Sequence, residues 1–283
     1  MRRTAAALAL LVVITAACAN EPGGSRDGGI DHPTGADQVV LRLSYEGGFV
    51  PIEYNLTQFP SFTLYGVGRV VVPGPQIEIY PGPALPAVNQ RIVTEEGVQV
   101  IVRAALEAGL GHGDRDHSDF GNTVIADATT AVFTFSANGQ SSRVSVYALA
   151  ELPDQPDGMP DEEFEARTVL NDLAGRLSAL EQWLPGGSVG PEEPFETDAY
   201  RLFVGRYRPA EELPQDPVEW PLPTPLAAGG DDTAGYACRP VSGEEWGSLA
   251  SLAREANQLT PWISAGTKFS VLFRPLLPDE SGC

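Results

Sequence analysis

Alternating apolar and polar positions predict that the folded part of the chain begins with β-strands. Val39–Tyr45 alternates and is rich in β-branched residues. Phe62–Tyr65 and Arg69–Val72 predict a hairpin, because the short Gly66-Val67-Gly68 segment joins them. Gln76–Tyr80 alternates too, between two Pro-Gly-Pro turns. Since proline cannot donate to a ladder, this strand is expected at a sheet edge or in a protrusion.

A helix and a second hairpin complete the first half of the pattern. Apolar residues recur at three- and four-residue spacing after Thr94, which is a suitable N-cap, and Gly109 ends the run. Ala131–Ala137 and Arg143–Leu149 predict the hairpin, because Asn138-Gly139 between them favours a tight turn. Residues 38–150 are therefore expected to form an α+β unit.

The second half has fewer regular segments. Residues 151–190 are expected to hold a connector and the longest helix, Asp161–Leu184, whose leucines recur on one face. Residues 191–283 form the C-terminal α+β unit, with strands expected at Tyr200–Val204 and Lys268–Phe273. A last helix is predicted over 242–257, with Ser242 and Glu245 as a capping box.

These elements predict an α+β fold with antiparallel sheets and about three main helices, near 94–108, 161–184 and 242–257. The body is one unit or two subdomains of similar size. The 25 prolines and 30 glycines among 283 residues also predict long ordered loops.

The N-terminus resembles a bacterial lipoprotein signal peptide over residues 1–17. Arg2 and Arg3 precede an apolar stretch of ten residues from Ala5 to Ile14, which is too short to span a bilayer. Small residues then lead to Cys18, whose sulfur is expected to carry the lipid. Ordinary cleavage after Ala17-Cys18-Ala19 is the alternative. The predicted location is the outer face of the cell membrane, with a lipid anchor.

Residues 18–37 are predicted to be a flexible tether, because glycine, proline and polar residues dominate this segment. Residues 19–37 are expected to be disordered. The tether would act as a spacer between the membrane and the folded body.

The remaining cysteines, Cys238 and Cys283, are predicted to form a disulfide. An even number of thiols in an oxidising compartment favours pairing, and no other pairing within the body exists. Two free cysteines are the alternative.

Composition excludes some partners. The chain has 18 basic and 38 acidic side chains, a formal charge of −20. Nucleic acid is therefore not expected as a partner, because phosphate binding requires a cationic surface. Arginine greatly outnumbers lysine, which is typical of a GC-rich genome.

Four segments resemble those of uncharacterised secreted or lipid-anchored proteins of high-GC, actinobacterial-type bacteria. The resemblance runs from about residue 39 onwards and implies a location but no known activity. The segments are Gly48-Phe49-Val50-Pro51, 60–66, 75–86 and 274–280.

Motifs for catalysis are scarce. The chain lacks a G-x-S-x-G elbow, an H-E-x-x-H helix, a P-loop and a dinucleotide fingerprint, and no cofactor is predicted. His112, Asp114, Asp116 and His117 could ligate a metal ion. The alternative, a solvated acidic loop, is preferred, so no metal site is predicted.

The predicted recognition residues are aromatic or lie in the stiff Pro73–Pro86 segment. If this segment offers its edge to another chain, Ile77 and Ile79 would face one way and Glu78 and Tyr80 the other, exposed to a partner. The alternative is that Ile77 and Ile79 simply cover the sheet and the prolines protect its edge from aggregation. Trp220 and Trp262 lie in proline-rich loops, where they either bind carbohydrate or a partner or pack into the core.

The preferred function is a non-enzymatic, membrane-tethered envelope protein that binds an unknown envelope protein or carbohydrate ligand. The alternative is a hydrolase of envelope polymers, with a carboxylate site assembled from distant residues. Two carboxylates in one cleft, one with a raised pKa, would favour the hydrolase.

Overall fold

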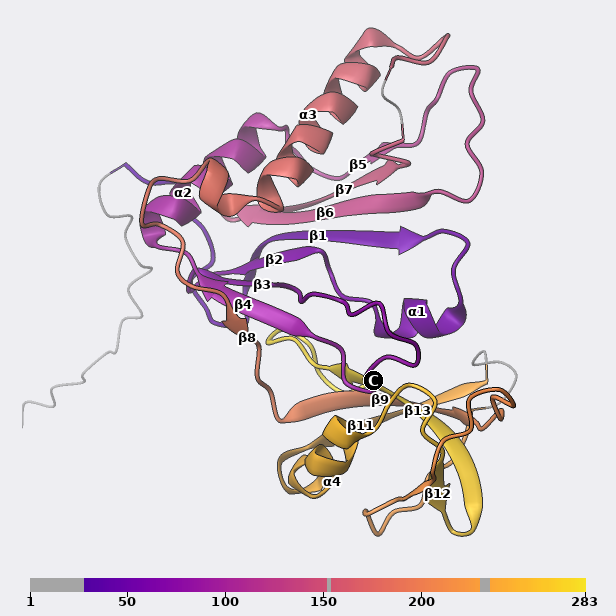
Figure 1. Ribbon diagram of the computed structural model, residues 1–283. Helices are drawn as coiled ribbons and strands as arrows, with labels where there is room; N and C mark the ends of the chain where they lie inside the picture. Colours follow the sequence, from indigo (N-terminus) through magenta and orange to yellow (C-terminus); the bar gives the residue numbers. More distant parts are fainter. Residues whose placement is uncertain (1–27, 152–153, 230–234) are drawn as a thin grey trace, which may run out of the picture.

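The computed structural model describes residues 28–151, 154–229 and 235–283, and it has an α+β fold built on two mostly antiparallel sheets (Figure 1). The first sheet has eight strands in the order β5-β7-β6-β1-β2-β3-β4-β8. Its strands are β1 (Val39–Gly47), β2 (Phe62–Tyr65), β3 (Arg69–Pro73), β4 (Val88–Ile92), β5 (Arg115–His117), β6 (Thr129–Ala137), β7 (Gln140–Tyr147) and β8 (Glu193–Pro194).

One face of this sheet packs on two helices, α2 (Glu95–Glu107) and α3 (Asp161–Leu177). Alternate residues of β1 and β6 point into this core, where they meet the apolar stripes of both helices. Two short helices, α1 (Ile52–Thr57) and η1 (Leu180–Gln182), are also present, and Leu180 of η1 belongs to the same core. Thr94 caps α2 as predicted, since its side chain accepts a hydrogen bond from the Gly97 amide.

The second sheet has five strands in the order β10-β12-β13-β9-β11, and α4 (Gly243–Glu255) packs on one face. The strands are β9 (Ala199–Arg206), β10 (Val218–Glu219), β11 (Tyr236–Ser242), β12 (Trp262–Ser264) and β13 (Thr267–Pro275). Figure 1 shows this second unit beside the β4 edge of the first sheet. Within the described residues, no helix has the length and apolar content needed to cross a membrane.

The core of the second unit contains Trp220 and Trp262, the two tryptophans considered from the sequence as recognition residues. Trp262 is fully buried and Trp220 is 9% exposed, and their rings meet edge to face at 5.9 Å. The Trp220 indole N–H donates to the Thr224 carbonyl oxygen at 3.0 Å, so its polar atom is satisfied inside the fold. A recognition role for Trp220 and Trp262 is therefore wrong, and the alternative of core packing holds.

The predicted disulfide between Cys238 and Cys283 is confirmed. It links β11 to the segment that follows β13, which we call the C-terminal tail (residues 276–283). A disulfide fits an oxidising, extracytoplasmic compartment.

The C-terminal tail lies between the two sheets and bonds to both. Arg42 of β1 forms a two-pronged ion pair with Asp279, with Nη–Oδ distances of 2.9 and 2.7 Å. The Tyr65 hydroxyl donates to the same carboxylate at 2.7 Å. Arg274 of β13 pairs in the same way with Glu280, at 2.6 and 2.8 Å. Leu277 fills an apolar cluster on the outer face of the first sheet.

Three local expectations are wrong. Residues 28–37 are not a free tether, because Ile30 packs on the first core and exchanges two backbone hydrogen bonds with the Gln99 side chain. Gln76–Tyr80 is not a strand, and the fourth strand is instead Val88–Ile92, after the loop. Ser242 precedes α4 without a side-chain capping bond, and the Glu245 side chain pairs with Arg239. Residues 1–27 lie outside the described part of the chain.

Replacing Asp279 with Asn is expected to lower the free energy of unfolding by about 1–2 kcal/mol, because Arg42 loses an ionised partner in a partly buried site. Urea unfolding at pH 7, with the disulfide intact, measures this loss. Glu46→Gln, which breaks an ion pair that is half-exposed on both sides, is the matched control and should cost less than about 0.5 kcal/mol.

The Asp279 contribution should depend on pH. Burial opposes ionisation of this carboxyl, but hydrogen bonds from Arg42 and Tyr65 outweigh burial and hold its pKa below the ordinary value of 3.8. The stabilisation is therefore complete above that value and declines as the pH falls through the lower pKa of the folded state. A difference between the wild type and Asp279→Asn that persists unchanged in strong acid would contradict this assignment.

Candidate functional site

Strand direction places several loops at one end of the first sheet. β1 and β3 run in the same direction, since each is antiparallel to β2, and β6 runs opposite to β1. The connections that leave β1 and β3 and the one that enters β6 therefore lie at the same end, which we call the distal end. They comprise residues 48–61, 74–87 and 118–128.

Exposed apolar side chains concentrate in these three connections. Of the eleven large hydrophobic residues exposed within the described ranges, seven belong to them. Phe49 is 89% exposed and Val124 is 92% exposed, which is unusual for side chains of this size. The seven, which we call the distal apolar set, are Phe49, Ile52, Tyr54, Ile77, Ile79, Tyr80 and Val124.

The loop from β3 to β4 is fixed at its base and along its second arm. The Gly74 amide donates to the Ala87 carbonyl oxygen at 2.9 Å, which closes the base. The second arm bonds to the end of α4 through Gly82–Gln258 and Ala84–Ala256, and Leu85 packs on the second core. The part between, residues 75–80, is exposed.

Glu78 and Tyr80 are exposed as the recognition hypothesis required, and Tyr80 is 67% exposed. Ile77 and Ile79 are exposed as well, so they do not cover the sheet. The expected alternation of two inward and two outward residues is therefore wrong here, because this segment pairs with no strand.

The other two distal connections are also held by hydrogen bonds, each of which involves a tyrosine hydroxyl. The Tyr147 hydroxyl accepts from the Ala128 amide and donates to the Ile125 carbonyl oxygen, which pins the loop that bears Val124. Glu53 of α1 accepts a hydrogen bond of 2.8 Å from the Tyr236 hydroxyl of β11. The loops are thus fixed through their backbones and polar groups, whereas their apolar side chains remain in solvent.

The first described residues lie at the opposite end of the same sheet. The Asn138 amide, in the β6–β7 turn, donates to the Asp31 carbonyl oxygen. Figure 1 shows this indigo segment beside α2, with α1 and the loops after β1 at the far end of the sheet. A nine-residue strand such as β1 spans about 30 Å. The chain therefore enters the fold at the end opposite the distal apolar set.

The four candidate metal ligands, His112, Asp114, Asp116 and His117, do not form one site. His117 bonds through Nδ1 to Glu163 at 2.7 Å, and Asp114 accepts from the Arg143 amide. His112 and Asp116 are exposed. Within the described residues, no group of three or more His, Cys, Asp or Glu side chains is placed to hold a metal ion.

His117 instead belongs to a buried network that joins α3 to the first sheet. Glu163 bridges His117 and Arg167, and the Arg167 guanidinium donates to the carbonyl oxygens of Tyr147 and His117. The same guanidinium lies 4.3 Å from the Phe120 ring centroid. Each of the three nitrogens of Arg167 therefore donates one hydrogen bond within the fold, so the network is structural.

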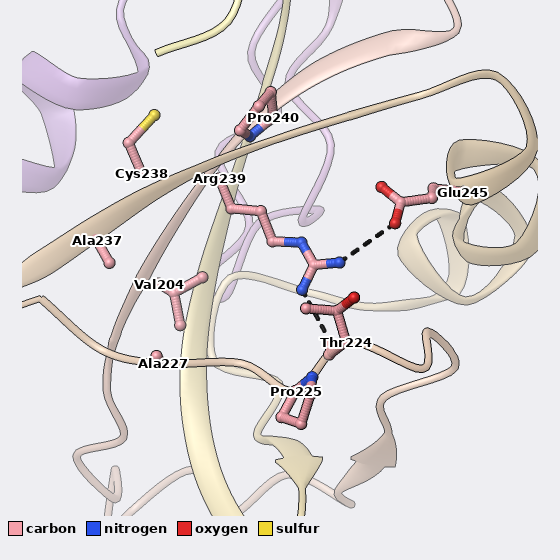
Figure 2. A pocket seen from close by; sticks show the side chains of 9 residues that line it. All are labelled: Val204, Thr224, Pro225, Ala227, Ala237, Cys238, Arg239, Pro240 and Glu245. Carbon is pink, nitrogen blue, oxygen red and sulfur yellow. Dashed lines mark hydrogen bonds and ion pairs between the residues drawn. The ribbon is translucent and has the colours of Figure 1, made fainter.

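A shallow pocket on the second unit offers no reactive group either. Figure 2 shows Arg239 between Thr224 and Glu245, and its guanidinium donates to the Thr224 carbonyl oxygen at 2.9 Å. The guanidinium also lies 5.4 Å from the Trp220 ring centroid. Small apolar groups form most of the remaining wall.

Carboxyl pKa shifts do not favour a general acid. In the described part of the chain, the carboxyls with a resolved shift have lowered pKa values. Hydrogen bonds from Arg91 and Asn89 lower the pKa of Glu192, for example. A hydrolytic site of the kind considered from the sequence would need a raised value.

Comparisons with protein-family models, curated proteins and solved structures give no match to this chain. The candidate functional site therefore stands on the geometry alone, and the geometry indicates the distal apolar set. Sequence periodicity could identify Tyr80, but it gave no signal for Phe49 or Val124, because isolated apolar residues in loops have no period.

Tyr236 should stabilise α1 in a pH-dependent way. Burial, together with the hydrogen bond to Glu53, raises the pKa of Tyr236 to about 12. The stabilisation is complete below the ordinary tyrosine value of 10.0 and is lost as the pH rises toward 12. Tyr236→Phe should cost about 1 kcal/mol at pH 8, and the cost should shrink above pH 10.

Chemical unfolding of both proteins between pH 8 and pH 12 provides the measurement. Tyr45→Phe is the control, since burial alone raises the pKa of Tyr45 and no carboxylate partner is involved. Equal unfolding midpoints for Tyr236→Phe and the wild type at pH 8 would show that the Glu53 contact contributes nothing.

Proposed function

We propose that this protein is a lipid-anchored, non-enzymatic protein of the extracytoplasmic face of the membrane, which binds another protein through the distal apolar set. The observation that carries the proposal is the concentration of exposed apolar side chains at the end of the first sheet opposite the chain's entry. An anchor at Cys18 would leave that end directed away from the membrane.

The chemistry of the surface favours a protein partner. Clusters of exposed apolar side chains mark interaction sites, and tyrosine is enriched where interface energy concentrates. The loops are held in place before binding, so ordering them costs little conformational entropy. Residues 75–80 are exposed and pair with no strand, so their backbone is available to an edge strand of the partner.

The negative charge of this chain favours a partner whose apolar patch is surrounded by basic residues. Glu78 lies within the exposed loop, Glu53 lies on α1, and the whole chain carries a formal charge of −20. An anionic lipid surface would be repelled, whereas a protein with an apolar groove and a basic rim would be attracted.

Tyr80→Ala and Ile79→Ala are expected to weaken partner capture at least tenfold, which corresponds to about 1.4 kcal/mol per substitution. Crosslinking in the native envelope, followed by quantitation of each captured protein, gives the measurement. The matched control is Val67→Ala, since Val67 is an exposed apolar residue in the β2–β3 turn at the other end of the sheet.

Thermal unfolding should be nearly the same for all three variants, because the substituted side chains are exposed. A crosslinked partner that is retained equally by Tyr80→Ala, Ile79→Ala and the wild type would refute the distal surface as its site. A partner lost with Val67→Ala alone would move the site to the opposite end.

Cys18→Ser is expected to release the protein from the membrane or leave it unprocessed, because the serine hydroxyl cannot receive the thioether-linked lipid. Fractionation with and without detergent gives the result. Retention of Cys18→Ser in the detergent-extractable membrane fraction at the wild-type level would refute lipid anchoring at this cysteine, without bearing on the distal surface.

A further inference from the structure

A polar cleft of about 400 Å³ lies between the two sheets, on the side of the C-terminal tail. β1 contributes Arg42 and Ser44 to its wall, and α1 with the residues after it contributes Asn55 and Gln58. The second sheet contributes Arg201 and Arg274. Aromatic rings, including Phe203 of β9, form the apolar part of the wall. A cleft of this size accommodates a small molecule of one or two rings.

Two of the three arginines in this cleft bind a carboxylate through both terminal nitrogens. Arg42 binds Asp279 in this way and Arg274 binds Glu280, both from the C-terminal tail. The arginines of this wall are therefore oriented so that they can bind a planar carboxylate through two parallel hydrogen bonds.

Arg201 differs from its two neighbours. Its Nε donates to the Gly282 carbonyl oxygen at 2.9 Å, but its Nη1 and Nη2 have no hydrogen-bond partner within the described ranges. No carboxylate in those ranges lies within ion-pair distance of it. Arg201 and Arg274 are register partners on β9 and β13, so their side chains are neighbours on one face of the sheet.

The local charge balance favours a single negative charge next to Arg201. Asp279 and Glu280 neutralise Arg42 and Arg274. The remaining acid of the cleft wall, Glu46, is bound through both carboxylate oxygens by Arg143. A dianion such as phosphate would be repelled by the carboxylates of Asp279 and Glu280. A monoanion instead balances the single positive charge of Arg201.

We propose that this cleft binds a sugar acid, a hydroxylated ring that bears one carboxylate. The carboxylate would accept hydrogen bonds from Nη1 and Nη2 of Arg201. Ser44, Asn55 and Gln58 supply a hydroxyl and two amides, which suit the ring hydroxyls because each can donate and accept. The 48–61 connection contributes residues to both this cleft and the distal apolar set, but none of the seven side chains of that set lines the cleft, and the proposal does not depend on the proposed protein partner.

Calorimetric titration of the disulfide-intact protein with glucuronate and with glucose tests the proposal. The two sugars have the same ring and differ in the carboxylate at one end. Glucuronate is expected to bind with a Kd on the order of 1 mM, and glucose at least tenfold more weakly. The proposal would be overturned if the two sugars bind equally well, or if glucuronate shows no binding at concentrations up to about 50 mM.

Arg201→Gln should weaken glucuronate binding at least tenfold, to the level of glucose, because the amide lacks the charge and the two-pronged geometry. Arg206→Gln is the matched control, since Arg206 is exposed on the same strand outside the cleft, and should bind glucuronate like the wild type. Equal affinity of Arg201→Gln and Arg206→Gln would overturn the assignment. If Arg201→Gln does not fold, the comparison of the two sugars on the wild type decides the question.

Discussion

The C-terminal tail holds the two sheets of this protein against each other. Its acids form two-pronged ion pairs with an arginine from each sheet, Asp279 with Arg42 and Glu280 with Arg274. Leu277, between the sheets and two residues before Asp279, fills an apolar cluster of the first sheet. Because the disulfide fixes the end of the tail to β11, the ion pairs form within a segment whose freedom is already reduced.

The arrangement of the loops depends on this contact between the units. α1 bonds to β11 through Glu53 and Tyr236, and the β3–β4 loop is bound along its second arm to the end of α4. If the second unit separated from the first, both connections would lose these partners. The second unit therefore supports two of the three loops that carry the distal apolar set, whereas Tyr147 of the first sheet holds the loop of Val124.

The same contact creates the polar cleft. Two sheets that pack through apolar faces alone would leave no room for Arg42, Arg201 and Arg274 between them. Charged groups in a partly buried position require partners, since desolvation of an unpaired guanidinium is costly. The tail supplies carboxylates for two of these arginines, so the structural role of the tail and the chemistry of the cleft have one origin.

Local periodicity predicted the α+β class and the positions of three helices to within a few residues, apart from the last turns of Asp161–Leu184, where α3 ends at Leu177. The Asn138-Gly139 dipeptide predicted the tight turn, and the cysteine count predicted the Cys238–Cys283 disulfide. The helices and the turn depend on residues that are close together in the chain. The disulfide could be predicted because Cys238 and Cys283 allow a single pairing within the folded body. The apolar face of a helix and the type of a turn depend on residues that are close together in the chain, so both can be predicted from the sequence.

The candidate sites were not predictable to the same degree. Exposure of Ile77 and Ile79 follows from the absence of a pairing strand. Burial of Trp220 and Trp262 follows from the packing of β12 and of the residues after β10 against α4 and β13. Arg42 meets Asp279 across 237 positions of sequence. The sequence by itself determined the main helices, several of the strands and the covalent link, because those depend on local or unique interactions. The tertiary structure alone decided which loops meet and which charges pair, because these contacts join residues far apart in the chain.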